Sequence, residues 1–145
     1  MKRVVIAMAA LLLVGSGGES GGGWGTHMME VGYRFALAGR AAESQNFALA
    51  DYELDELGEA FAHVKNVPQP EDVPKSVKLA GLVDAYQRDT LPALRKAAKA
   101  KDLRAFRNVY AQAVVQCNAC HKTAEKPFLK VPAIPQGATF LELKP

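Results

Sequence analysis

One short run of residues has the types and spacing needed for specific chemistry: Cys117-Asn118-Ala119-Cys120-His121. The run fits C-x-x-C-H, the attachment pattern of c-type haem. Residues three and four apart lie on one side of a helix, so the two thiols and the imidazole would share a patch. The thiols can add across the two vinyl groups of a haem while the imidazole reaches the iron from the same side. We therefore expect one covalent haem c, held by Cys117 and Cys120, with His121 as an iron ligand.

Three other interpretations of the same residues are open on the sequence alone. A dithiol redox site is expected where a strand leads into a helix, whereas this motif ends a long helical pattern. A zinc site would need about two further ligands, for which His27 and His63 are the other histidines. The third alternative is a pair of structural cysteines that happens to precede a histidine. An export signal and the use of both cysteines in one motif favour haem.

The beginning of the chain indicates export. Met1-Lys2-Arg3 precedes an apolar run from Val4 to Val14, which is typical of a secretory signal peptide and too short to span a bilayer. The alternative, a buried N-terminal helix, is disfavoured because seven of the twelve glycines fall between Gly15 and Gly25. We expect residues 1–25 to be a signal peptide and flexible tether, and residues 26–145 to be one haem-binding domain.

The same segment resembles a bacterial lipoprotein box that lacks its acylated cysteine. In Leu13-Val14-Gly15-Ser16, serine stands where the lipid-bearing cysteine would be. Because serine cannot carry a thioether-linked lipid, we expect a periplasmic or otherwise exported protein that is soluble and has no membrane span.

Composition excludes several other classes. Two cysteines cannot build a disulfide-dense scaffold, and a formal net charge of +3 is too small to indicate nucleic-acid binding. A basic cluster surrounds the last expected inter-helix loop, and we interpret it as solvated surface, with docking of an acidic redox partner as the alternative. Its members are Lys96, Lys99, Lys101, Arg104 and Arg107.

Hydrophobic periodicity predicts four helices. The first covers about His27 to Ala42, and the second carries an apolar stripe from Phe47 to Val64. The third runs from about Pro74 to Ala100, with a kink or break at Pro92, and the fourth follows an N-cap at Asp102 and contains the cysteines. We expect an all-α fold, an antiparallel up-down-up-down four-helix bundle, with residues 128–145 as an extended tail on its surface.

A helical domain with the C-x-x-C-H motif near the end of its last helix resembles the class II c-type cytochromes, the cytochrome c prime-like family. The resemblance covers roughly Thr26 to Lys126. It implies haem attachment through Cys117 and Cys120, His121 as the proximal ligand, redox partner proteins, and a homodimer formed through two of the helices. No Ser/His/Asp set, phosphate loop or close acidic pair points to an enzyme.

The sixth iron ligand separates two functions. The bundle topology brings the start of the first helix near the haem, and Met28 shares the apolar face of that helix. Low-spin members of the resembled family take a distal methionine from this place, so Met28 is the expected ligand, Met29 the second choice, and His27 and His63 rank lower. We expect an exported mono-haem cytochrome that transfers single electrons. The alternative is a five-coordinate haem protein that binds nitric oxide or carbon monoxide.

Overall fold

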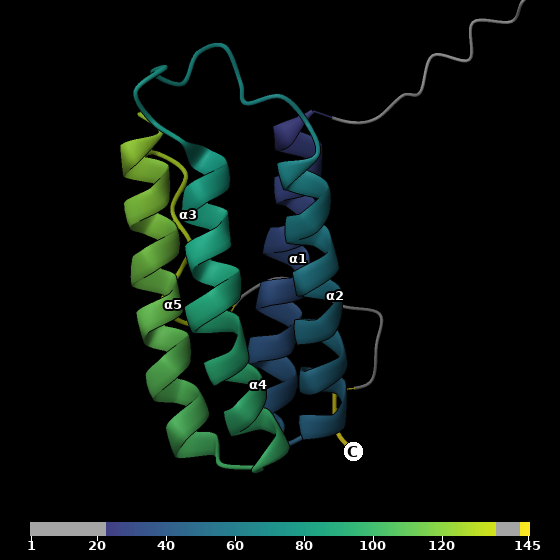
Figure 1. Ribbon diagram of the computed structural model, residues 1–145. Coiled ribbons are helices and arrows are strands. Elements are labelled where there is room, and N and C mark those ends of the chain that lie inside the picture. Colours follow the sequence, from purple (N-terminus) through teal and green to yellow (C-terminus); the bar gives the residue numbers. More distant parts are fainter. Residues whose placement is uncertain (1–22, 136–142) are drawn as a thin grey trace, which may run out of the picture.

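The computed structural model describes residues 23–135 and 143–145, and among these it contains helices and no strands. Four helical columns pack side by side in an antiparallel up-down-up-down bundle, as expected (Figure 1). The third column is continuous and is made of two α-helical pieces joined by a π-helical turn. The elements are α1 (Trp24–Glu43), α2 (Phe47–Lys65), α3 (Leu79–Ala85), η1 (Tyr86–Thr90), α4 (Leu91–Lys99) and α5 (Leu103–Thr123).

Side-chain caps start two of the helices where the sequence indicates. Asp102 accepts a hydrogen bond from the backbone N–H of Ala105 at 2.9 Å, which confirms the expected N-cap of α5. Asn46 caps α2 in the same way, through Leu49 N at 3.1 Å. Both caps follow tight turns, so α1 and α2, and likewise α4 and α5, must run antiparallel to each other.

The first helix begins earlier than its periodicity suggests. It starts at Trp24 rather than near His27, because the Trp24 indole is buried and donates a hydrogen bond to Val67 O at 3.1 Å. This bond ties the start of α1 to the chain that leaves α2. Residues 1–22, which hold most of the expected signal peptide and tether, lie outside the described residues.

The expected start of the third helix at Pro74 is wrong. Residues 66–78 form turns and irregular structure, and α3 begins at Leu79, whose backbone N–H donates to the Gln69 side chain at 3.0 Å. Each proline in this segment restricts the residue before it to extended backbone, and Pro74 lies too early to open the helix. The segment crosses one end of the bundle, between α2 and α3 (Figure 1).

The expected disturbance at Pro92 takes the form of the π-helical turn η1. Proline lacks a backbone N–H and its ring clashes with the carbonyl four residues earlier, here that of Arg88. The wider turn over Tyr86–Thr90 lets the helical column continue past this clash. Tyr86, the first residue of η1, has a buried side chain.

The chain after α5 turns back along the bundle as an extended strap, residues 127–135. The Asn118 amide donates to Val131 O at 3.0 Å and accepts from Val131 N at 2.8 Å, which fixes the middle of the strap to α5. Further along, Pro135 packs against Gly39 of α1, where an added Cβ would lie 2.5 Å from the proline Cγ. The described part of the tail therefore bears out the expected extended course, whereas residues 136–142 lie outside the described residues.

Within the described ranges, no helix has both the length and the apolar character needed to cross a membrane. The basic cluster around the loop between α4 and α5 lies at the opposite end of α5 from the cysteines. With a rise of about 1.5 Å per residue, the 14 residues from Leu103 to Cys117 separate the two places by about 21 Å. Arg107 of this cluster is paired with Glu43 at 2.5 Å.

Candidate functional site

A cavity of about 620 Å³ lies at the end of the bundle where α1 begins and α5 ends. Its walls come from α1, α2, the α3–η1 column, α5 and the strap, and they are almost entirely apolar. The chemically capable side chains in these walls are Met28, Met29, Tyr86, Tyr110, Gln116, Cys117, Cys120, His121, Thr123 and Lys130. Aspartate and glutamate do not occur among the lining residues.

The last two turns of α5 present the motif to this cavity. Cys117, Cys120 and His121 are all half-buried and all line it, because their spacing of three and one keeps them on one side of the helix. Both cysteines are free. Burial raises the pKa of the Cys117 thiol to about 12, with a smaller contribution from neighbouring Cys120, whose own pKa burial also raises. Both groups are therefore protonated thiols at neutral pH.

The imidazole of His121 is held in one orientation by the strap. Its Nδ1 lies 2.7 Å from the backbone carbonyl oxygen of Leu129. A carbonyl can only accept, so Nδ1 carries the proton and the Nε2 lone pair is free for a metal. Asn118, the second residue of the motif, holds the strap in place through its two bonds to Val131. Because the strap carries Leu129 O, Asn118 helps to orient His121 of the same motif.

The two candidate methionines lie at different depths on α1. Met28 is half-buried, packs against the core and lines the cavity. Met29 also borders the cavity, but 77% of its surface is exposed. The bundle thus brings the start of α1 to the cavity that holds Cys117 and His121, as the expected topology requires, and Met28 is the more enclosed of the two thioethers.

Tyr86 is the feature of this cavity that sequence analysis missed. Its side chain is 4% exposed and lines the cavity, and its hydroxyl is buried without a hydrogen-bond partner among the described residues. Burial, together with the nearby Cys117 and Tyr110, raises its pKa well above the usual value, so the hydroxyl stays a proton donor. Tyr86 follows the buried Leu79 and Val83 at α-helical spacing, so the sequence predicts its burial but not the missing partner of its hydroxyl.

The remaining histidines lie elsewhere. Neither His27 nor His63 lines the cavity, so neither can complete a zinc site with the two thiols there. His63 is exposed, as its position off the apolar stripe predicts, whereas His27 lies in the first turns of α1 and is half-buried. The two imidazoles face each other across α1 and α2, with ring centres 5.9 Å apart.

Comparison of the chain with protein-family models, with curated proteins and with solved structures finds no match. The resemblance to class II c-type cytochromes accordingly rests on the motif and on its place in the helical pattern.

Proposed function

We propose that this chain is an exported mono-haem c-type cytochrome that transfers single electrons. One observation carries the proposal: two thiols and a histidine with a fixed tautomer lie together in the wall of one large apolar cavity. The cavity also receives Met28 from the facing helix. In this proposal Cys117 and Cys120 hold the haem, His121 is the proximal ligand and Met28 is the distal ligand.

The residues present fit this group in three respects. A cavity of about 620 Å³ falls within the roughly 300–1,000 Å³ that small-molecule and cofactor sites occupy. Its apolar walls suit a porphyrin, and Lys130, exposed at its edge, suits the negative propionates. The buried hydroxyl of Tyr86 has no partner among the described protein groups, and leaving such a group unsatisfied costs about 1–3 kcal/mol. A bound ligand that accepts a hydrogen bond from this hydroxyl would remove that cost.

The state of the thiols argues against a dithiol redox site. Reactive dithiols have a lowered cysteine pKa and lie in electropositive, partly exposed surroundings. Here burial raises the pKa of Cys117 to about 12 instead. Attachment to haem needs only that each S–H adds across one vinyl group, with sulfur bonded to one carbon and hydrogen to the other.

A haem bound here would supply a one-electron iron couple. The chain's own part in electron transfer is to keep the ligands fixed and water excluded. The strap orients His121 through Leu129 O, and the hydrogen bond makes the imidazole more electron-rich. Met28 provides a soft thioether, and a histidine–methionine pair in an apolar cavity raises the reduction potential. Redox partner proteins are then the physiological contacts, and no catalytic residue is required.

One observation favours a second function, the binding of nitric oxide or carbon monoxide at a five-coordinate iron. A hydrogen-bond donor in the distal pocket is a principal control on which small gases a haem binds. Tyr86 lines the cavity and its buried hydroxyl is a donor without a partner among the described residues, so gas binding would require this hydroxyl to turn toward the iron. This function requires that Met28 pack beside the iron without binding it.

Two experiments test the proposal. The protein is matured in a haem-attaching bacterial host and run on a denaturing gel that is stained for haem; absence of covalent haem ends the proposal. Absorption spectra of the reduced protein with and without carbon monoxide then separate the two functions. A low-spin spectrum that carbon monoxide leaves unchanged supports electron transfer, whereas a high-spin spectrum that shifts supports gas binding.

A further inference from the structure

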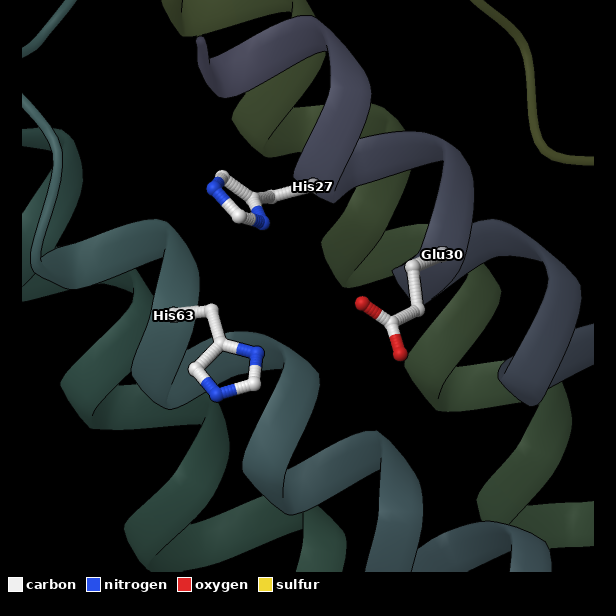
Figure 2. Close-up of side chains that lie close together, drawn as sticks. All are labelled: His27, Glu30 and His63. Carbon is white, nitrogen blue, oxygen red and sulfur yellow. The ribbon is translucent and has the colours of Figure 1, made fainter. Parts of the chain in front are cut away.

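A second group of ligand-type side chains lies outside the cavity, between α1 and α2. His27 and Glu30 lie one turn apart on α1, and His63 lies in the last turn of α2 (Figure 2). One ligand atom from each of the three side chains lies within 4.8 Å of the other two. Figure 2 shows the three side chains turned toward the space between the two helices. None of them lines the cavity.

Contacts between α1 and α2 lie on both sides of the cluster. At the end of the bundle, the Trp24 indole is bonded to Val67 O at 3.1 Å, which fixes the start of α1 beside the end of α2. Farther along the helices, Arg34 of α1 is paired with Glu53 of α2 at 3.0 Å. Because these contacts hold the two helices together, we expect ligand binding to proceed by side-chain rotation with little movement of the backbone.

The distances suit such a rotation. Metal–ligand bonds of about 2.0–2.1 Å in a tetrahedral site place the ligand atoms about 3.3 Å from each other. The cluster must therefore close by at most about 1.5 Å. His63 is exposed and can turn without displacing core atoms, while His27 and Glu30 are half-buried and more restricted.

The local charge favours a divalent cation. The guanidinium nitrogens of Arg34 lie 3.0 Å from a carboxylate oxygen of Glu53 and 3.2 Å from one of Glu56. The contact with Glu30 is longer, at 4.0 Å. The single positive charge of Arg34 faces three carboxylates, of which Glu53 is 1% exposed and takes the closest contact. The three carboxylates and the one guanidinium together carry a net charge of −2. Of the three carboxylates, that of Glu30 lies beside the imidazoles. A doubly charged ion would balance this net charge.

We propose that His27, Glu30 and His63 form a binding site for a divalent transition-metal ion, with Zn²⁺ as the ion of best fit. Two imidazoles and one carboxylate are a known zinc ligand set, and the exposed side of the cluster leaves the fourth position to water. Mg²⁺ and Ca²⁺ prefer oxygen ligands and are not expected to bind. Because the site shares no residue with the cavity, the metal proposal does not depend on the haem proposal.

The test is calorimetric titration of the full chain, as purified and freed of metal with a chelator, with Zn²⁺ as the probe. Wild type is compared with His63→Ala, Glu30→Gln and a matched control, Glu59→Gln. Glu59 is an exposed carboxylate on α2, one turn before His63 and outside the cluster. Other Zn²⁺-binding groups, including any free thiols, are the same in all four proteins, so differences between them report on the cluster.

We expect His63→Ala to weaken Zn²⁺ binding at least about 100-fold, Glu30→Gln about tenfold, and Glu59→Gln less than twofold. At a Zn²⁺ concentration of one hundred times Kd, the wild-type Tm should rise by about 10 °C, and Mg²⁺ should not shift it. Circular dichroism checks that each variant is folded. The proposal is overturned if wild type shows no Zn²⁺-dependent rise in Tm, or if His63→Ala binds Zn²⁺ as tightly as wild type.

Discussion

Replacing Asn118 by alanine removes the clamp that holds the strap to α5. Two hydrogen bonds are lost, at 3.0 Å and 2.8 Å, both between the Asn118 amide and the backbone of Val131. Each contributes about 1 kcal/mol net to stability, so together they contribute about 2 kcal/mol. Alanine is the better helix former by about 0.6 kcal/mol, which offsets part of this loss. Asn108→Ala, at an exposed position of the same helix, has the same helix-propensity gain and serves as the control.

Urea unfolding followed by circular dichroism gives the free energy of unfolding of both variants. Asn118→Ala should be less stable than Asn108→Ala by about 2 kcal/mol. In the haem-loaded protein the loosened strap should also weaken the hydrogen bond from His121 to Leu129 O. A less electron-rich imidazole stabilises the oxidised iron less well, so the reduction potential should rise in Asn118→Ala and stay unchanged in Asn108→Ala.

Equal stability of the two variants would refute this reasoning about the strap. It would mean that water replaces the Asn118–Val131 bonds at no cost in free energy. A stability difference without a change in potential would be a narrower failure, because the clamp would then hold the strap without acting on His121.

Three further predictions concern the cavity and its surroundings. Met28→Ala should convert a low-spin reduced spectrum into a high-spin one that responds to carbon monoxide, whereas Met29→Ala should leave it low-spin; the reverse pattern would make Met29 the ligand. Gly39→Ala places a Cβ 2.5 Å from a carbon of the strap and should lower the free energy of unfolding by about 1–2 kcal/mol, while Gly81→Ala, with open space around it, should raise it by up to about 1 kcal/mol. In the haem-free protein a Cys117 pKa of about 12 leaves about one thiol in 10⁴ ionised at pH 8, and the greater nucleophilicity of a more basic thiolate offsets part of this loss. Alkylation of Cys117, measured by peptide mass so that Cys120 is counted separately, should therefore be about 10²-fold slower than for a free cysteine and should accelerate as the pH rises toward 12. Fast alkylation of Cys117 at pH 8 would contradict the buried-thiol description.

The helices could be predicted from the sequence wherever one apolar stripe decides the structure. The stripe of α2 and the Asp102 cap of α5 are local signals, and both agree with the structure. The start of α3 could not be predicted from such a local signal. Proline suits the first turn of a helix, but it also suits the turns that precede a helix, and Pro74 lies in such a turn. The start of α1 depends on the bond from Trp24 to Val67 O, which joins residues 43 apart in sequence.

Some residues of the candidate site could likewise be predicted from the sequence, and others could not. Three of its residues come from one helical segment, so their shared patch follows from spacing, and the topology brings Met28 to them. The sequence predicts the burial of Tyr86 but not its unpartnered hydroxyl, and it gives no signal for Leu129. Leu129 contributes a backbone carbonyl, which any residue type could supply. The His27–His63 pair likewise follows from the register between α1 and α2, which only the folded chain sets.

The central claim is covalent attachment of one haem through both cysteines. Its most direct test is the intact mass of the denatured protein after maturation in a haem-attaching host, measured for wild type and for the double variant Cys117→Ser/Cys120→Ser. We expect wild type to carry the added mass of one haem and the double variant to carry none. A wild-type mass equal to that of the unmodified chain would contradict the claim.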